Sequence, residues 1–420
     1  MKDNQAKYPQ LRFKGFTDPW VQRNLAYLSD GFSYGLNAAA KEYDGVHGYL
    51  RITDIDEVSH SFLPEGLTSP DVPEDQLTDY RMDEQSIVYA RTGASTGKTY
   101  IYRDSDGELY YAGFLIRQKV NKETSAQFVY QNTLTKAWER YVQVMSQRSG
   151  QPGINAQEVG RFELAIPEKA EQDKIAHLFN SLDNLIAANQ RKLDLLKEQK
   201  KGYLQKMFPK NGAKVPELRF AGFADAWEQR KLSDIATLNA RIGWQNLRTS
   251  EFLESGDYML ITGTNFHDGT VDYSTVHYVE KNRYEQDTKI QVENGSILIT
   301  KDGTLGKVAL VQGLNMPATL NAGVFNVKIK DPETIDVDYV YQYLAAPFLM
   351  KYANAKSTGG TIKHLNQNIL IDFPVLLPRK REQVKLAELL NGLDNTITLH
   401  QRKLEKLQEL KKGYLQKMFC

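Results

Sequence analysis

Residues 191–208 read RKLDLLKEQKKGYLQKMF, and residues 402–419 read RKLEKLQELKKGYLQKMF, which is nearly the same phrase. A second phrase also occurs twice, because PQLRFKGFTDPWVQRNL at 9–25 returns as PELRFAGFADAWEQRKL at 216–232. The two displacements are 211 and 207 residues. Solenoid repeats are only about 20 to 50 residues long, so each copy of this much longer unit should be a domain with an appended element.

Each copy ends in a segment with the apolar periodicity of a coiled-coil helix. Pro167 and Pro378 mark the starts of the two helices. At 1.5 Å per residue each helix is roughly 60 Å long, so it needs a partner. Both helices can be read as buried supports, but the cyclic order domain, helix, domain, helix favours an antiparallel pair with pseudo-twofold symmetry. The apolar positions are Ile175, Phe179, Leu182, Ile186, Leu193, Leu196, Tyr203 and Met207 in the first copy, and Leu386, Leu390, Leu393, Ile397, Leu404, Leu407, Tyr414 and Met418 in the second.

Polar residues interrupt the two apolar stripes at equivalent places: Asn189 and Lys200 in the first helix, His400 and Lys411 in the second. A polar residue inside a coiled-coil seam often specifies the alignment of the helices. We therefore expect Asn189 to face Lys411 and, by the pseudo-twofold, Lys200 to face His400.

The segments between the repeated ends predict two α+β domains in tandem, each followed by its long helix, with the two helices paired as an antiparallel coiled coil. Helical periodicity appears at 125–146 and 338–355. The predicted ranges are 1–166 and 209–377 for the domains and 167–208 and 378–420 for the helices. Runs rich in Ile, Val, Tyr and Phe predict strands at 86–91, 108–120, 296–300, 308–311 and 324–329.

The two domains share only short anchors, and their remaining sequences diverge. Similar scaffolds with dissimilar loops indicate two related domains that do the same kind of job on two different targets. The shared anchors are Gly97-Lys98 and Gly306-Lys307, Ala112-Gly113 and Ala322-Gly323, and Asn155 and Asn366.

Composition bounds the class of protein. Hydrophobic residues make up 41% of the 420 residues, enough for more than one core. The sequence has no run of 18 apolar residues and no signal-peptide pattern, and Cys420 is its one cysteine, so a cytoplasmic location is the default expectation and no membrane partner is expected. The formal net charge of +1 does not decide about nucleic acid, because acidic residues elsewhere can balance a basic face.

No catalytic motif is present, which favours a binding protein over an enzyme. The phrase GASTGKT at 93–99 places three residues between its glycines, whereas a phosphate-binding P-loop needs four. Gly-x-Ser-x-Gly, His-Glu-x-x-His and clustered Cys/His patterns with metal spacing are also missing from the sequence, so no catalytic residue and no metal site is predicted. The two Gly-Lys loops are either tight turns between strands or basic loops that approach a phosphate backbone.

Polar and basic side chains in these loops and their neighbours have the donors and acceptors that base edges and phosphates require. Each of them alone is also compatible with an ordinary solvated or structural role. The candidate DNA-binding residues are Arg51, Arg91, Thr92, Ser95, Lys98, Gln147, Arg148 and Gln151 in the first domain, and Arg241, Gln245, Arg248, Lys301, Asp302, Thr304, Lys307, Lys363, His364 and Asn366 in the second.

The whole repeated pattern resembles the specificity subunits of bacterial type I restriction-modification systems. The resemblance rests on the cyclic order, on LRFKGFTDPW and LRFAGFADAW, on ILITKDGTLGKVAL, and on the passage from LAIPEKAEQDKIAHLFNSLD or VLLPRKREQVKLAELLNGLD into the repeated helix. The first domain departs from the usual loop, since it has RTGASTGK where an Asp-Gly or Gly-Ser version is commoner.

This resemblance implies a non-catalytic, DNA-reading subunit. Each domain would recognise one half of a split, asymmetric site on double-stranded DNA, and the helices would set the spacing between the halves. Two modification subunits, which use S-adenosylmethionine, and two restriction subunits, which use ATP and magnesium, would be its partners, while this chain itself would hold no cofactor. The alternative is a scaffold that tethers two proteins through its duplicated domains and ignores DNA.

Overall fold

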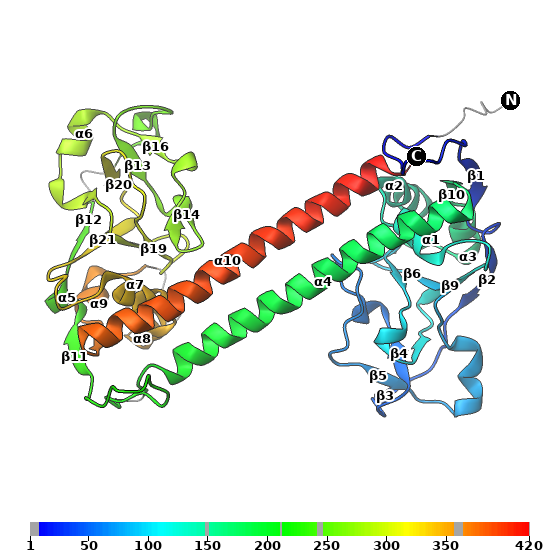
Figure 1. Cartoon of the computed structure of the whole chain (residues 1–420), viewed down its shortest axis with the longest axis horizontal. Coiled ribbons are helices and arrows are strands. Elements are labelled where there is room, and N and C mark those ends of the chain that lie inside the picture. Colours follow the sequence, from blue (N-terminus) through cyan, green and yellow to red (C-terminus); the bar gives the residue numbers. More distant parts are fainter. Residues whose placement is uncertain (1–7, 148–150, 211, 242–246, 357–363, 420) are drawn as a thin grey trace. The chain divides into compact units, whose positions relative to one another are not determined.

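A computed structural model describes residues 8–147, 151–210, 212–241, 247–356 and 364–419. The chain divides into two compact units, the first made of Met1–Gln190 with Lys403–Cys420 and the second of Arg191–Arg402. Two helices of 38 residues each, α4 (Lys169–Lys206) and α10 (Lys380–Lys417), contribute to both units. They are the two long helices in Figure 1.

The first unit is built around a four-stranded antiparallel sheet. Its strands follow the order β2 (Ser29–Tyr34), β9 (Leu115–Val120), β6 (Ser86–Ala90) and β7 (Thr99–Ile101). Every residue of β6, with the sequence SIVYA, is buried, as its β-branched and aromatic composition predicts. The smaller pairs are β1 (Val21–Asn24) with β10 (Glu163–Ile166), β3 (Ala40–Glu42) with β5 (Thr68–Pro70), and the parallel pair β4 (Gly48–Leu50) with β8 (Leu109–Tyr111).

The second unit repeats this plan with additions. Its larger sheet has the order β12 (Ala236–Ala240), β21 (Val324–Ile329), β18 (Ile297–Thr300), β19 (Val308–Leu310), β15 (Thr270–Val271) and β14 (Phe266–His267). The first four strands correspond in order to β2, β9, β6 and β7. The other sheet has the order β16 (His277–Tyr278), β13 (Met259–Ile261), β20 (Ala318–Leu320) and β17 (Gln291–Val292), and β11 (Glu228–Lys231) pairs with β22 (Pro374–Leu377).

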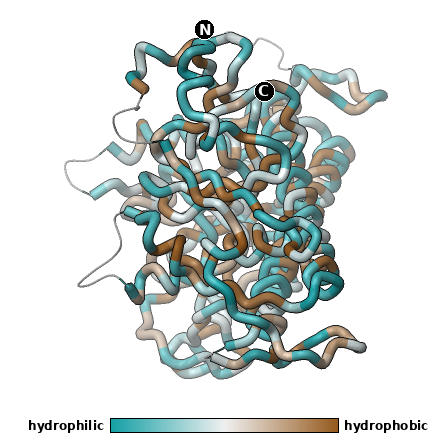
Figure 2. Tube along the Cα trace, turned by 90° about the vertical axis from the view of Figure 1, so that its left-hand side faces the viewer, coloured by the Kyte–Doolittle hydropathy of each residue, from teal (hydrophilic) through white to brown (hydrophobic). Residues whose placement is uncertain are grey.

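The shorter helices complete each unit, so the mixed helix and sheet content predicted from the sequence is confirmed. The first unit has α1 (Ala126–Asn132), α2 (Lys136–Met145) and α3 (Ala156–Gly160). The second has α5 (Leu232–Ile235), α6 (Lys281–Glu285), α7 (Val337–Ala345), α8 (Phe348–Lys356) and α9 (Gln367–Ile371). Hydrophobic and hydrophilic stretches alternate along the trace in Figure 2, and no helix of the described residues is long and apolar enough to cross a membrane.

Three predicted elements are each split in two, for local reasons. The predicted strand over 108–120 is β8 and β9, separated by a turn in which the Leu115 N–H donates to Ala112 O at 2.8 Å. The predicted helix over 125–146 is α1 and α2, because the Thr135 side chain accepts from the Trp138 N–H and caps a new helix. The predicted helix over 338–355 breaks at Pro347, which lacks a backbone donor.

The repeated phrase GYLQKMF supplies an aromatic residue to each core. In the first unit the Phe419 ring lies 5.4 Å from that of Phe128 and 5.6 Å from that of Phe179. In the second unit the Phe208 ring lies 5.9 Å from that of Trp227. The backbone repeats the match, since the Leu11 N–H donates to Lys417 O and the equivalent Leu218 N–H donates to Lys206 O, both at 2.8 Å. The first core is therefore completed by the far end of the chain.

The two long helices run antiparallel within each unit. In the first unit Asp183 pairs with Lys411, and Phe179, four residues earlier, contacts Phe419, eight residues later. In the second unit Lys200 pairs with Asp394 at 2.6 Å. The antiparallel pairing predicted from the cyclic order is thus seen in both units.

The helix register differs from the predicted one. We expected Lys411 to face Asn189 and Lys200 to face His400. Lys411 instead pairs with Asp183 at 2.7 Å, and Lys200 pairs with Asp394 at 2.6 Å. Each aspartate lies six residues before the predicted partner on the same helix. Six residues correspond to about 9 Å of helix. The physical reason is that an ammonium forms a stronger bond with a carboxylate than with an amide such as that of Asn189.

A buried ion pair fixes the start of each long helix. The Arg12 guanidinium donates twice to the Glu171 carboxylate, with both distances 2.8 Å, and Arg219 donates to Glu382 at 2.7 and 2.8 Å. The Glu171 side chain is 0% exposed and that of Arg12 is 14% exposed. Hydrogen bonding to Glu171 raises the pKa of Arg12. The Arg12 guanidinium is therefore held in its charged form.

Glu171→Gln should lower the free energy of unfolding of the first unit by about 3 kcal/mol, because it leaves a largely buried guanidinium without its counter-charge. Asp173→Asn is the matched control, since Asp173 pairs with Lys169 on the same helix but both side chains are exposed. That change should cost less than about 1 kcal/mol. Equilibrium denaturation of the full chain measures both, and equal effects would contradict the prediction.

Phe419→Ala should destabilise the first unit by about 3 kcal/mol and leave the second unit unchanged, whereas Phe208→Ala should do the reverse. Hydrogen exchange read separately on β9 and β21 resolves the two units, because exchange protection reports local stability. Loss of protection in β21 on replacing Phe419 would refute the assignment of that side chain to the first core.

Candidate nucleic-acid interface

The two Gly-Lys loops are hairpin connections, which is the turn interpretation of the sequence. The loop after β6 closes with the Ala90 N–H donating to Lys98 O and the Gly97 N–H donating to Ala90 O, both at 2.8 Å. The loop after β18 repeats this, with Thr300 and Lys307 in the same roles at 2.9 Å. Each hairpin therefore presents the same backbone frame in its own unit.

The second glycine of each hairpin is required by close packing as well as by its backbone. Gly97 and Gly306 have positive φ angles of 86° and 73°. A Cβ atom at Gly97 would lie 2.6 Å from Val142 of α2, and one at Gly306 would lie 2.2 Å from the Met350 sulfur of α8. These helices pack against the turns, so a side chain at either glycine would clash unless its neighbours moved.

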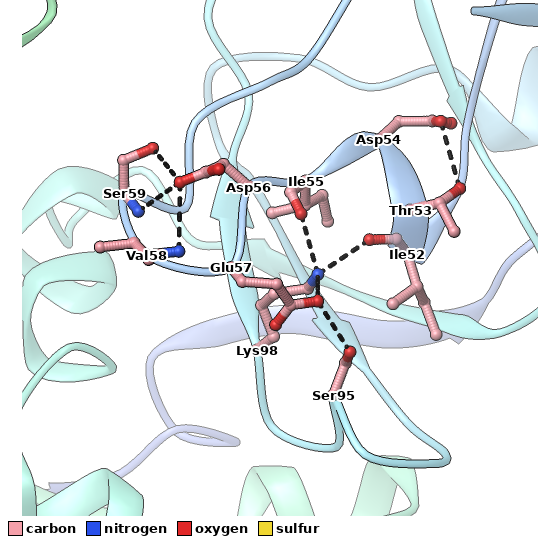
Figure 3. A network of polar contacts seen from close by, with 10 residues as sticks. All are labelled: Ile52, Thr53, Asp54, Ile55, Asp56, Glu57, Val58, Ser59, Ser95 and Lys98. Carbon is pink, nitrogen blue, oxygen red and sulfur yellow. Dashed lines mark hydrogen bonds and ion pairs between the residues drawn. The ribbon is translucent and has the colours of Figure 1, made fainter. Parts of the chain in front are cut away.

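Lys98 is a structural residue in this frame. Its ammonium donates to Ile52 O at 2.9 Å, to Ile55 O at 2.8 Å and to the Glu57 carboxylate at 2.7 Å (Figure 3). These three acceptors use all three N–H groups of the ammonium. The side chain is buried, and the bond from Lys98 lowers the pKa of Glu57. Lys98 therefore has no donor left for a phosphate.

Ser95 shares the hydrogen-bond network of Lys98, whereas Lys307 differs from Lys98 in its exposure to solvent. Ser95 Oγ donates to Glu57 at 3.0 Å, so Ser95 belongs to the same network (Figure 3). Lys307, the counterpart of Lys98, donates to Phe266 O at 2.7 Å, but the residue is exposed. Lys307 thus stays accessible to a ligand in a way that Lys98 does not.

Two of the candidate arginines are also committed to the fold. Arg51 donates from Nε and Nη2 to the Asp54 carboxylate, at 3.0 and 2.9 Å, and that carboxylate accepts the Arg51 N–H as well. Arg241 is 2% exposed and donates to Leu320 O at 2.9 Å and to Thr319 Oγ1 at 3.3 Å. Burial lowers the pKa of Arg241. Its guanidinium is not at the surface.

The other candidates of the first unit gather beside the hairpin loop. Arg91 directly follows β6, Thr92 forms an isolated bridge with Gly153, and the exposed Gln151 amide lies next to Gly93. Gln147 is exposed just beyond the end of α2. The structure thus brings Arg91, Thr92 and Gln151 together, while Arg148 lies outside the described residues.

The remaining candidates of the second unit fall into a hairpin group and a separate one. Lys301, Asp302 and Thr304 lie in the hairpin loop, and His364 Nδ1 is 2.6 Å from Asp302 Oδ1. Asn366 occupies the N-cap position of α9 without a side-chain capping bond, whereas the Asn155 side chain caps α3 by accepting from the Glu158 N–H. Arg248 is exposed before a 3-10 turn, and its N–H donates to Glu251. Gln245 and Lys363 lie outside the described residues.

The structure adds aromatic and basic residues that sequence reasoning missed. An open groove of about 700 Å³ in the first unit is lined by Tyr34, Arg81 and Arg117 among others. Phe114, at the start of β9, is 62% exposed. The alternation of LIRQKV in β9 is the signal that could have singled out Arg117, whereas exposure of aromatic residues has no sequence signal. No three metal-ligating side chains gather anywhere in the described parts of the chain.

The described geometry can be compared with known proteins. A family model for the type I restriction modification DNA specificity domain matches residues 55–198 and 224–409, one match in each repeat. The matches span most of the chain, so the chain belongs to this family. The resemblance stated from the repeated phrases is thereby confirmed.

Relatives along the full length are specificity subunits by name. The type I restriction enzyme MjaVIII specificity subunit of Methanocaldococcus jannaschii is 22% identical over 382 residues, which cover 89% of this chain and 85% of that protein. The putative MjaX specificity subunit of the same organism is 21% identical over 402 residues, with 94% and 91% covered. The crystal structure of an S subunit from M. genitalium has a TM-score of 0.67 at 16% identity over 99% of both chains, which confirms the predicted fold class.

Lys98→Met should destabilise the first unit by about 1–3 kcal/mol, because it removes the donor shared by two buried carbonyls and a carboxylate. Lys307→Met should change stability by less than about 0.5 kcal/mol, since that lysine is exposed. Thermal unfolding of the two variants makes the comparison. A stable Lys98→Met protein with weakened DNA binding would show instead that Lys98 acts on a ligand.

Proposed function

We propose that this chain is the sequence-specific DNA-binding subunit of a type I restriction-modification complex and reads a bipartite, asymmetric target. The observation that carries the proposal is the presence of two DNA specificity domains on one backbone plan with different loop chemistry. Arg91 and Lys301 occupy the same place in the two hairpins, and the buried Lys98 corresponds to the exposed Lys307. Two hairpins with the same backbone hydrogen bonds but different side chains are suited to bind two different half-sites.

We further propose that the chain is not catalytic and directs partner subunits. Two modification subunits that use S-adenosylmethionine, and two restriction subunits that use ATP and magnesium, would assemble with it, and this chain would bind none of these cofactors. Its relatives carry the name of specificity subunits, which supports this division of work. Calorimetry with S-adenosylmethionine and the purified chain should give no heat of binding.

A shift assay separates this function from that of a protein scaffold. The complex with the modification subunit should retard duplexes that contain the target more than duplexes of scrambled sequence, with an affinity that falls as salt rises. A scaffold would retard neither duplex.

A chain carrying two copies of Pro9–Phe208 should recognise a symmetric site, in which the first half-site is repeated. Such a chain should fold, because GYLQKMF is identical at 202–208 and 413–419 and can complete the core that Phe419 completes now. Methylome sequencing of a strain that expresses it with the modification partner gives the site. The reciprocal chain with two second domains is the control, and methylation of the original asymmetric site by either chimera would contradict the proposal.

A further inference from the structure

The Arg91 side chain is the cation of the first hairpin that the fold holds in place without neutralising it. Its Cζ atom lies 5.1 Å from the centroid of the Tyr34 ring and 6.0 Å from that of Phe114. Within the described part of the chain, its guanidinium has neither an ion pair nor a hydrogen bond, and Nε is buried without a partner. Arginines that serve the fold, such as Arg12 and Arg51, hold a carboxylate.

The backbone of Arg91 is fixed on both sides. The Arg91 N–H donates to Phe114 O at 3.1 Å, and Arg91 O accepts from the Ile154 N–H at 2.9 Å. A β-carbon at Gly153 would lie 3.3 Å from Arg91 O, so the neighbouring loop passes close to this residue. Tyr34 is fixed too, because its hydroxyl accepts from the Ala156 N–H at 3.3 Å. Hydrogen bonds therefore hold both the backbone of Arg91 and the Tyr34 ring that its guanidinium contacts.

The same position holds a cation in the second unit. The Lys301 N–H donates to Gly323 O at 2.9 Å, and Lys301 O accepts from the Leu365 N–H at 3.0 Å, which repeats the pattern of Arg91. The Lys301 ammonium lies 5.7 Å from the centroid of the Phe325 ring. None of the described residues gives this ammonium a carboxylate or a hydrogen bond. Two diverged domains thus keep an unneutralised cation against an aromatic ring at one backbone position.

The two cations differ in what they can recognise. A guanidinium is a planar fork of donors that suits two acceptors side by side, whereas an ammonium is a point charge. In the major groove, guanine offers such a pair in O6 and N7, and arginine bound to both is the commonest specific contact. A phosphate can accept the same fork of donors. The base edge requires that fork in one plane, however, and the contacts of Arg91 with the Tyr34 and Phe114 rings restrict its orientation, which favours a base edge as its ligand.

We propose that Arg91 is a specificity-determining residue of the first domain and that its stacked guanidinium reads a guanine in the first half-site. Tyr34 and Phe114 are positioning residues that hold the fork in the plane of the base edge. This inference rests on the proposed function, since it assigns a base contact within the proposed DNA-reading surface.

The test compares methylation by complexes of the full chain with the modification subunit. The probes are duplexes that carry the wild-type site and duplexes with one guanine of the first half-site replaced at a time. Arg91→Lys keeps the charge and removes the fork. Arg23→Lys is the matched control, because Arg23 also lies over a ring, that of Tyr27 at 4.9 Å, and among the described residues its guanidinium donates to a backbone carbonyl, Gln22 O.

We expect Arg91→Lys to methylate the wild-type site roughly 10- to 100-fold more slowly and to lose discrimination at one guanine of the first half-site only. Phe114→Leu should give a smaller loss at that same guanine, and Lys301→Gln should affect the second half-site alone. Arg23→Lys should behave like the unaltered chain. A melting curve of each variant shows whether it is folded, and Arg91→Lys changes no packed carboxylate pair.

Three results would overturn the proposal. A uniform loss across all duplexes with unchanged base preference would make Arg91 a phosphate contact. Unchanged kinetics would make it structural, as would a first half-site that contains no guanine on either strand. If the unaltered complex methylates no defined sequence, the proposed function fails first and this inference fails with it.

Discussion

The structure depends on one constraint: neither globular core is complete without the end of a long helix that belongs to the other repeat. Phe419, which is partly buried, packs against the first core beside Phe128, although 291 positions separate the two residues in the chain, and the buried Phe208 fills the second core beside Trp227. Helix ends that complete similar cores must stay similar. This explains why GYLQKMF is identical in the two copies, while loops that meet no such core have diverged.

The packing of the long helices on the cores divides the cations into those that pair with a carboxylate and those that do not. Cations that orient the helices meet carboxylates, as in the pairs Arg12 with Glu171 and Lys411 with Asp183. These pairs recur at equivalent positions in the second unit, where Arg219 meets Glu382 and Lys200 meets Asp394. A cation with its counter-charge in the fold has little electrostatic energy left to offer a ligand. Among the described residues, Arg91 and Lys301 have no carboxylate partner, so the positive charge of each is not neutralised within the fold.

The architecture was predictable from the sequence because repetition and apolar periodicity are properties of the sequence itself. The apolar stripe predicted α4 and α10, and the cyclic order predicted their antiparallel pairing. The register was not predictable from the stripe, because Lys411 is bound by Asp183, a polar residue beside the stripe. The helix breaks at Thr135 and Pro347 have sequence signals, a capping residue and a proline without a backbone donor. The apolar period continues across both positions, so it predicted one helix where there are two.

The candidate site was less predictable, because the fate of a lysine or arginine depends on partners far away in the sequence. Lys98 donates to carbonyls 43 and 46 residues away, and the local sequence RTGASTGK does not predict those acceptors. Exposure of Phe114 and its approach to Arg91 depend in the same way on how β6 and β9 pair. The sequence therefore predicted that both loops carry polar and basic side chains, but it did not predict which of those side chains are bonded within the fold.

The glycines preserve the backbone of the hairpin in both units. Val142 packs against Gly97 and Met350 against Gly306, so a larger residue at either glycine would clash unless its neighbours moved. A change in the side chains that the turn presents requires no such movement. A change from arginine to lysine at the first loop position replaces a donor fork with a point charge and leaves the fold intact. Divergence of the two domains at Arg91 and Lys301 is the kind of change that this frame permits.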